Sequence, residues 1–399
     1  MKIQTVKLGE ICEINPRTDF DFGLKDPCSF VPMEAVDEVD ALIARMTTRP
    51  FHEVAKGYTP FAENDVIVAK ITPCMENGKC AIGRRLSSGV AFGSTEFHVL
   101  RATKHVIPEW LFYFWRFAPT RKLAALNMTG SAGQKRVPAS FLETVDIPLP
   151  EISEQRRIAA QLEQADRLRR TRRYALELTE TFLPAAFLEL FGETSDRFLA
   201  FTVEELASDK PNAIRTGPFG SQLLHSEFTS SGIAVLGIDN AVNNEFAWSQ
   251  RRFITPAKYE QLKRYTVFPG DVIVTIMGTC GRCAIVPDNI PLAINTKHLC
   301  CITLDKDRCL PIYLHGAFLF HPFVRRQQNV ATKGSIMDGL NMEIIRNLRI
   351  PLPPIPLQQE FATIVERVEH LRGVQREALR QAEHLFASLL DRAFSSCPQ

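Results

Sequence analysis

Two long stretches of the chain carry apolar or small residues at steps of three and four, which predicts two amphipathic helices with heptad-like seams. The first seam is expected at Ile158, Leu162, Ala165, Leu168, Ala175 and Phe182, with Arg172 as an interruption. The second is expected at Phe361, Ile364, Val368, Leu371, Ala378, Ala382, Leu385 and Leu389, interrupted by Gln375. We expect the two helices to pair as an antiparallel coiled coil, a rod ~46 Å long at 1.5 Å per residue. Pro184 is expected to end or kink the first helix.

An internal repeat surrounds both helices. The segment from Ile147 to Arg170 matches the segment from Ile350 to Gly373 at a constant offset of 203 residues, and Gln155 is among the identical positions. In each copy the stretch IPLP directly precedes the helix. We expect this stretch to be extended, because a residue that precedes proline avoids helical angles. Upstream, VIVAKITPCMENGKCAI and VIVTIMGTCGRCAI each predict a strand, a turn and a strand.

These patterns predict an α+β chain with two pseudo-repeated globular domains of mixed α/β structure, each followed by a long helix. We expect the first domain at residues 1–148, its helical spacer at 149–193, the second domain at 194–351 and the second spacer at 352–399.

Composition and charge fit a globular protein better than a DNA-coating one. The chain is 45% apolar and 23% charged, with a net charge of only +2. A generic nucleic-acid coat is more basic, so any grip on DNA must come from local clusters or from other subunits. The N-terminus lacks an apolar signal core, and the apolar run from Trp110 to Trp115 is too short to span a bilayer, so we expect a cytoplasmic protein.

Sequence motifs for catalysis are scarce. The only Gly-Lys pair, Gly78-Lys79, lacks the upstream glycine of a phosphate-binding loop. We expect no cofactor and no metal. A zinc site built on Cys280, Cys283 and the adjacent Cys300-Cys301 stays open as an alternative, although the adjacent pair falls in a predicted strand and should face opposite sides.

Two polar features have a bland and a functional interpretation. The glycine-serine tips at 129–136 and 332–335 are either connecting loops or sites where amides, Ser, Gln and Lys meet a phosphate or a base edge. The run Arg167, Arg169, Arg170, Arg172 and Arg173 is either a solvated helix face balanced by nearby acids or a contact with phosphates or an acidic partner.

Three features occur together: the IPLP-x-x-x-x-Q entries to the two helices, the stretch from Ala186 to Gly192 that closes the first half, and the stretch from Arg215 to Leu223 that opens the second domain. In these features the chain resembles the specificity subunits of type I restriction-modification systems. The resemblance implies a non-catalytic subunit whose two domains are target-recognition domains, each reading one half of a split site in double-stranded DNA. It further implies that the helices set the spacing and dock adenine methyltransferase subunits, two in number, and that a motor-nuclease subunit joins for restriction. A protein-protein scaffold built from two repeats remains the alternative.

Polar residues at equivalent tips are the candidate DNA contacts, because Arg and Lys pair with guanine, and Asn and Gln with adenine. In the first domain they are Lys70, Thr72, Asn77, Lys79, Ser94, Thr95, Ser131, Gln134, Lys135 and Arg136. In the second domain they are Arg215, Thr216, Ser221, Gln222, Thr279, Arg282, Asn295, Lys297, Lys333 and Ser335.

Overall fold

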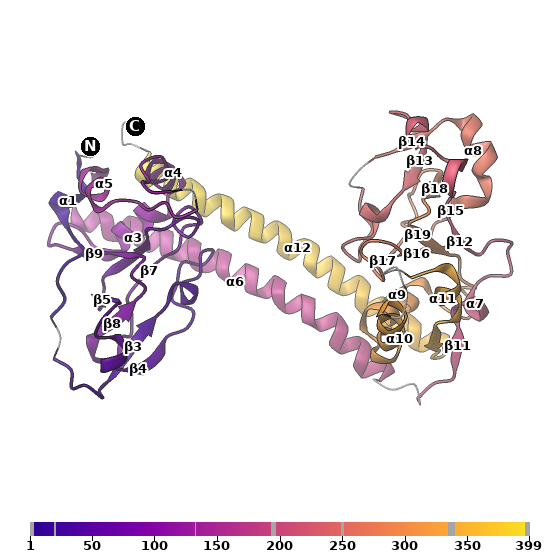
Figure 1. Ribbon diagram of the computed structural model, residues 1–399, viewed down its shortest axis with the longest axis horizontal. Helices are drawn as coiled ribbons and strands as arrows, with labels where there is room; N and C mark the ends of the chain where they lie inside the picture. Colours follow the sequence, from indigo (N-terminus) through magenta and orange to yellow (C-terminus); the bar gives the residue numbers. More distant parts are fainter. Residues whose placement is uncertain are drawn as a thin grey trace. The chain divides into compact units, whose positions relative to one another are not determined.

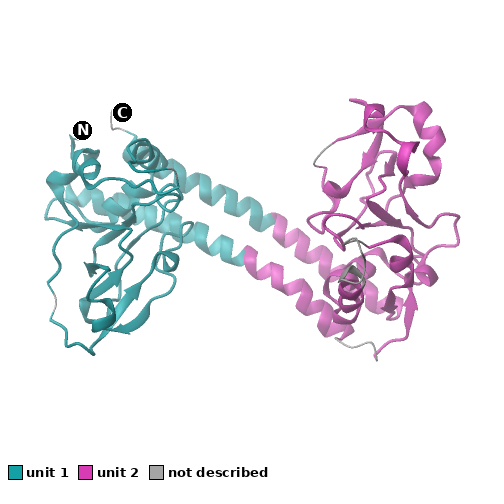
Figure 2. Cartoon of the chain, in the orientation of Figure 1, with its two compact units in different colours: residues 1–175, 374–399 teal, residues 176–373 magenta. Residues whose placement is uncertain are grey.

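The computed structural model describes residues 4–19, 21–131, 133–192, 197–248, 251–333 and 340–395. It divides the chain into two compact units, and each long helix contributes one part to each unit. Unit 1 consists of residues 1–175 and 374–399, and unit 2 of residues 176–373 (Figure 2). The C-terminal residues thus belong with the first globular domain.

Unit 1 contains two four-stranded sheets and a two-stranded ribbon (Figure 1). The first sheet is antiparallel in the order β2 (Cys12–Ile14), β9 (Phe97–Ala102), β6 (Val66–Ala69), β7 (Cys80–Ile82). The second has the order β4 (Thr47–Pro50), β3 (Pro27–Val31), β8 (Val90–Gly93), β5 (Thr59–Ala62), in which β3 and β8 run parallel. The ribbon pairs β1 (Gln4–Lys7) with β10 (Asp146–Leu149).

Unit 2 repeats this topology strand for strand. Its antiparallel sheet has the order β12 (Ile214–Thr216), β19 (Leu299–Ile302), β16 (Val272–Thr275), β17 (Cys283–Ile285). Its second sheet has the order β14 (Phe253–Ile254), β13 (Ile233–Leu236), β18 (Ala293–Asn295), β15 (Thr266–Val267), with β13 and β18 parallel. The ribbon pairs β11 (Ala200–Thr202) with β20 (Arg349–Pro351). The predicted mixed α/β repeat and its strand-turn-strand elements are confirmed.

Short helices accompany the sheets in both units. In unit 1 they are α1 (Leu8–Ile11), α2 (Phe51–Val54), α3 (Pro108–Arg116), α4 (Ala118–Leu126) and α5 (Ala139–Thr144). In unit 2 they are α7 (Val203–Leu206), α8 (Pro256–Leu262), α9 (Pro311–Phe320), α10 (Pro322–Lys333) and α11 (Met342–Asn347). The aromatic helices α3 and α9 lie in the cores, where Trp110 and Tyr313 are fully buried, so these rings pack and are not an exposed stacking platform.

The two long helices are α6 (Ile152–Phe191) and α12 (Ile355–Phe394), each 40 residues and therefore about 60 Å long. α6 continues through Pro184, so the expectation that the helix ends at this residue is wrong. Beyond Pro184, Phe187 and Phe191 are fully buried against Phe361 of α12 within unit 2. That packing outweighs the backbone hydrogen bond that proline cannot make.

The predicted seam residues differ in burial. Leu162, Ala165, Phe361 and Val368 are buried, and Ile158 and Ile364 are half-buried. Leu168, Phe182, Leu371 and Leu385 are exposed, by 41%, 52%, 52% and 45%. In unit 1 the buried position of α12 is the next one along, Phe386, which packs with Leu390 in the core of the first domain. The globular core therefore selects a face one position away from the one that the heptad pattern indicates.

A glutamine fastens each domain to its long helix in the same way. Gln155 accepts a hydrogen bond from the Ile107 N–H (3.0 Å) and donates to the carbonyls of His105 (3.0 Å) and Pro150 (2.9 Å). Gln358 does the same, 203 residues later, with Leu310 (2.8 Å), Arg308 (3.0 Å) and Pro353 (2.8 Å). Both side chains are fully buried.

Candidate nucleic-acid interface

Three loops of unit 1 converge on one surface. In the loop after β6, Lys70 N donates a hydrogen bond to Glu96 O (2.9 Å), and Thr72 N donates one to Lys135 O (3.0 Å). Val137, which directly follows the third loop, donates from its backbone N to Lys70 O (2.9 Å) and so joins that loop to the first. These segments contain eight of the predicted DNA contacts, which are Lys70, Thr72, Ser94, Thr95, Ser131, Gln134, Lys135 and Arg136. We name residues 70–72, 94–96, 129–131 and 133–136 the loop cluster.

Charge in the loop cluster is organised by an ion pair. Arg136 donates from Nη2 to Glu96 Oε1 (2.8 Å) and from Nε to both carboxylate oxygens (3.1 and 2.9 Å). The hydrogen bond from Arg136 holds the pKa of Glu96 below its usual range. Gln134 and Lys135 remain exposed beside this pair. The cluster therefore presents amide and cationic groups around a guanidinium of fixed orientation.

Two other predicted contacts in unit 1 are held against a neighbouring loop. Asn77 donates from Nδ2 to Glu38 Oε2 (3.1 Å), and Lys79 donates from Nζ to the carbonyl of Met33 (3.3 Å). Their polar groups thus serve the attachment of residues 33–40. Ser131 is exposed within the loop cluster itself.

A cavity of about 560 Å³ occupies the corresponding region of unit 2. Its lining includes the nitrogen-bearing side chains of Lys297, His298, His225, Arg251 and Arg252. The loop that carries Lys297 is closed by the bond from Leu299 N to Thr296 O (3.1 Å), as its counterpart in unit 1 is closed by the bond from Phe97 N to Ser94 O (3.1 Å). Equivalent loops therefore lie at both candidate surfaces.

Ser221, Thr279 and Arg282 of the predicted set are exposed in unit 2. Gln222 is also exposed, although its Oε1 accepts a hydrogen bond from Tyr265 O–H (2.9 Å). Ser335 and the side chain of Lys333 lie outside the described residues.

Three predicted contacts in unit 2 lie in the interior instead. Arg215 is 5% exposed, pairs with Asp271 and donates from Nε to the carbonyl of Thr266 (2.8 Å). Asn295 is fully buried and donates to the Leu299 carbonyl (3.0 Å), and Thr216 is buried beside them. A side chain that is enclosed by its own domain cannot reach a base, so we remove these three from the candidate interface.

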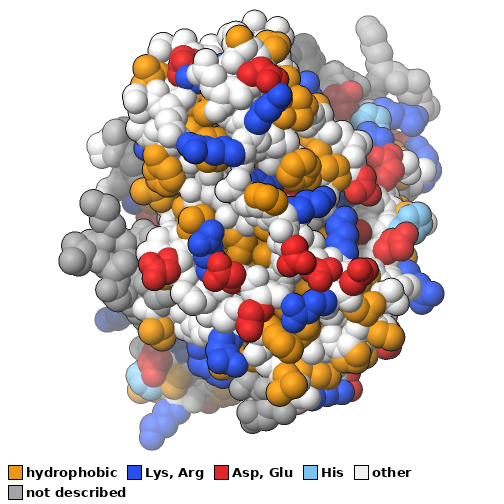
Figure 3. Space-filling model, turned by 90° about the vertical axis from the view of Figure 1, so that its right-hand side faces the viewer, with side chains coloured by type: hydrophobic (Ala, Val, Ile, Leu, Met, Phe, Trp, Pro, Cys, Tyr) orange, Lys and Arg blue, Asp and Glu red, His pale blue; other side chains and the backbone are white. Residues whose placement is uncertain are grey.

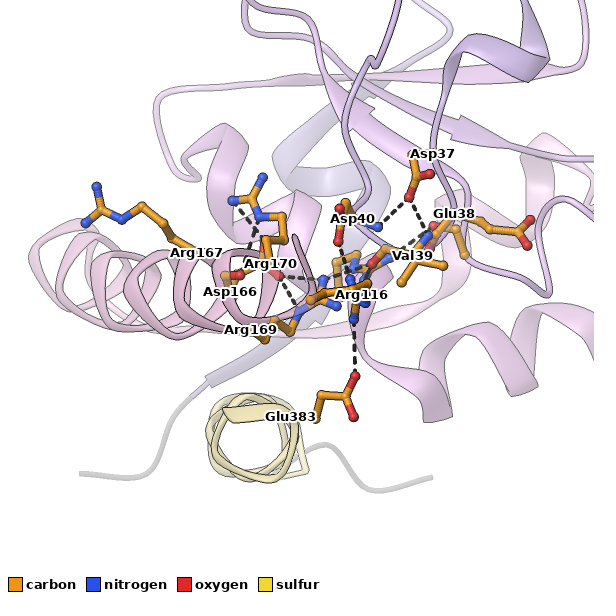
Figure 4. A network of polar contacts seen from close by, with 12 residues as sticks. Asp37, Glu38, Val39, Asp40, Arg116, Asp166, Arg167, Arg169, Arg170 and Glu383 are labelled. Carbon is orange, nitrogen blue, oxygen red and sulfur yellow. Dashed lines mark hydrogen bonds and ion pairs between the residues drawn. The ribbon is translucent and has the colours of Figure 1, made fainter. Parts of the chain in front are cut away.

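The arginine run of α6 is largely engaged within unit 1 (Figure 4). Arg169 binds Asp166 (2.6 Å) and the Val39 carbonyl (2.9 Å), and Arg170 also reaches Asp166 (3.3 Å). Arg173 pairs with Asp40 and with Glu383 of α12 (3.1 Å). Asp166 is thus a partner, as expected, but Arg169 is buried and not part of a solvated face, and Arg173 pairs with acids outside α6. These contacts hold residues 39–40 against α6.

Cysteines give no sign of a metal site in the part of the chain that the structure describes. Cys300 and Cys301 lie in different hydrophobic cores, on opposite faces of β19, as their adjacency in a strand predicts. No group of three or more His, Cys, Asp or Glu side chains that could hold a metal occurs among the described residues. Likewise, none of the helices described is both long and apolar enough to cross a membrane.

The sequence patterns did not indicate Glu96 as the partner of Arg136, Asp40 as the partner of Arg173, or the histidines that line the cavity of unit 2. Glu96 directly follows Ser94-Thr95, and His298 directly follows Lys297, so both stood beside residues that the pattern had singled out. The acidic stretch at 37–40 was the available signal for a partner of the arginine run.

Comparison with known proteins gives one family for the chain. The family model described as "Type I restriction modification DNA specificity domain" matches residues 2–178 and 224–381. The EcoAI specificity subunit of a type I restriction enzyme from Escherichia coli is 39% identical over 158 residues, which are 39% of this chain and 27% of that protein. The chain thus aligns with about a quarter of the length of that relative.

Two solved structures share the fold. The type I restriction-modification system S subunit from M. genitalium superposes with a TM-score of 0.60 at 13% identity, over 99% of this chain and 96% of that one. A chain from a study of complex assembly in the type I R-M system gives 0.59 at 20% identity, over 98% and 97%. Because the family model covers most of both halves, we conclude that the chain belongs to the type I restriction-modification DNA specificity family.

Proposed function

We propose that this chain is the DNA sequence-specificity subunit of a type I restriction-modification complex and that each globular domain reads one half of a split DNA site. The observation that carries the proposal is the family match over both halves of a chain whose two units repeat one topology. A reader of two separate half-sites needs two copies of one recognition domain, and a subunit of this kind has no catalytic role of its own.

DNA contact is assigned to the loop cluster of unit 1 and to the cavity of unit 2. The loop cluster exposes Gln134 and Lys135, and the cavity is lined by Lys297, Arg251 and Arg252, all of which suit phosphates or base edges. On the face seen in Figure 3, Lys and Arg side chains lie among Asp and Glu side chains, so that face is of mixed charge. Binding is therefore expected from these local sites and not from a general basic coat.

The helices are assigned the spacing role, as an antiparallel coiled coil that separates the recognition domains. Contacts between α6 and α12 inside each unit support the pairing, including Arg172 with Gln375 (3.3 Å) in unit 1 and Arg372 with the Thr179 carbonyl (2.8 Å) in unit 2. The proposed segments are domains at 1–148 and 194–351 and spacers at 149–193 and 352–399, and each compact unit contains parts of both spacers.

Methyltransferase docking is assigned to the helices as well. Each unit exposes large apolar side chains there, with Tyr174 and Val374 at 62% and 52% in unit 1 and Leu178 at 51% in unit 2. Clustered exposed apolar residues are typical of surfaces that a partner covers. Two adenine methyltransferase subunits, one for each repeat, are the proposed partners, with a motor-nuclease subunit joining for restriction in the cytoplasm.

The test is to co-express the full chain with its methyltransferase partner and to map methylated adenines across the host genome by single-molecule sequencing. The expected motif consists of two short specified blocks around a fixed unspecified gap. Gln134→Ala or Lys297→Ala should weaken recognition of one block each, whereas Gln359→Ala, an exposed glutamine on α12, should leave both intact. If the complex forms and methylates no defined motif, the scaffold alternative replaces the proposal.

A salt titration provides an independent measurement on the purified complex. DNA affinity should fall log-linearly with salt, by about 0.9 unit of slope for each phosphate neutralised. A scaffold that does not bind DNA would show no such dependence.

A further inference from the structure

Arg136 keeps two hydrogen-bond donors for a ligand. A guanidinium carries five N–H groups, one on Nε and two on each terminal nitrogen. Glu96 takes the Nε–H and one N–H of Nη2, and the Gln134 carbonyl takes one N–H of Nη1 (2.9 Å). One N–H on each terminal nitrogen remains. The arginine side chain is 40% exposed and Glu96 is 25% exposed, so the pair sits at the surface and not in the core.

Guanine matches this pair of donors better than the other bases do. In the major groove guanine offers two acceptors, O6 and N7, whereas adenine offers N7 next to an amino donor. An arginine that is held in one plane by a carboxylate has already lost the rotational freedom that such pairing costs. Glu96 therefore acts as a positioning residue for Arg136.

Electrostatics favours a base edge over a phosphate at the same place. The carboxylate of Glu96 already compensates the charge of Arg136 and would repel a phosphate brought to the same guanidinium. A neutral acceptor edge meets no such repulsion. The neighbouring Lys135 is exposed, and its ammonium group suits a phosphate.

We propose that Arg136, oriented by Glu96, reads one guanine in the half-site bound by the first domain. The inference rests on the proposed function and adds to it the identity of one base and of the residue pair that reads it.

The genetic test compares three variants in the methylation assay. Arg136→Lys keeps the charge but loses the fork, and Glu96→Gln keeps the size but weakens the support of the guanidinium. Each should relax the preference for guanine at the same single base pair by roughly 5- to 150-fold, with the other half-site unchanged. Arg84→Lys is the matched control, since Arg84 pairs with Glu109 at the surface of the same domain, outside the loop cluster, and should alter nothing.

A second measurement uses the unaltered complex, so that it does not depend on the folding of any variant. Duplexes that carry 7-deazaguanine lack the N7 acceptor at one chosen position. Binding should weaken by at least about 5-fold at the guanine that Arg136→Lys affects, and the Arg136→Lys complex should not respond to that replacement.

The outcomes separate the inference from the function on which it rests. A split motif that stays unchanged in both variants, or a half-site whose guanines all tolerate the 7-deaza base, would overturn the role of Arg136 and leave the specificity function in place. If the wild-type complex forms and methylates no split motif, the proposed function fails and this inference fails with it. If a variant yields no methylation, the 7-deazaguanine series on the wild-type complex decides.

Discussion

Replacing Gln155 or Gln358 by methionine should destabilise one unit at a time. Methionine keeps the length and approximate volume of the side chain, so the change removes polar contacts without opening a large cavity. Each variant removes the side-chain partner of one backbone N–H and two carbonyls at partly buried positions, those of Ile107, His105 and Pro150 in the case of Gln155. An unpaired buried group costs about 1–3 kcal/mol, and partial relaxation of the three groups suggests a total of about 2–4 kcal/mol.

The assay is thermal unfolding combined with hydrogen exchange. For a unit of about 200 residues, 1 kcal/mol lowers Tm by roughly 2–4 °C, so the affected unit should melt roughly 4–16 °C earlier. Exchange at the Ile107 amide should accelerate in Gln155→Met, and exchange at the Leu310 amide should accelerate in Gln358→Met, without crossing over. Gln359→Met is the matched control, because that side chain is exposed and neighbours Gln358. Unchanged exchange and melting in both glutamine variants would refute the fastening role.

Four further substitutions test the packing and charge described above. Gly373→Ala should raise the free energy of unfolding by about 1 kcal/mol because its Cβ meets nothing within 4 Å, whereas Gly316→Ala places a Cβ 2.9 Å from a buried phenylalanine ring and should lower it by about 1–3 kcal/mol; chemical denaturation measures both, and equal effects would contradict the packing. Arg215→Met should cost about 3–5 kcal/mol by leaving Asp271 buried without its partner, yet leave the methylated motif unchanged; a changed motif at full stability would return Arg215 to the interface. Burial lowers the pKa of His315, so the unfolded chain takes up a proton first as pH falls and stability should decline below about pH 6.5; the slope of Tm against pH should shrink in His315→Gln, and an unchanged slope would contradict this.

Repeated polar fasteners explain why so much of the fold could be predicted from the sequence. Gln155 and Gln358 lie near the start of a long helix, and each donates a hydrogen bond to the last proline carbonyl of the IPLP stretch. The glutamine therefore has the same spacing to IPLP in both copies. An offset search detects such fixed spacings directly. The seam of the helices was harder, because α12 offers apolar residues on adjacent faces and only the domain core decides that Phe386 is buried and Leu385 is not.

The candidate site was less predictable, since exposure depends on partners far away in sequence. Arg136 and Arg215 both stand near glycine-rich tips, and nothing local separates them. Arg136 meets Glu96 at the surface, while Arg215 meets Asp271 inside a core. The acid that each arginine finds, 40 or 56 residues away, determines whether it can face a ligand.

A buried carboxylate lies at the equivalent position of each globular domain, but the strand that supplies its arginine partner differs. Asp65 and Asp271 hold equivalent positions before Val-Ile-Val, and each accepts a backbone N–H, from Ala62 (2.7 Å) and from Phe268 (2.8 Å). Yet the arginines that neutralise them come from different strands, Arg101 from β9 and Arg215 from β12. A buried carboxylate requires a cation within reach but does not fix the strand that supplies it. The two domains therefore share a strand topology, a buried carboxylate and a glutamine fastening, while the strand that supplies the neutralising arginine differs between them.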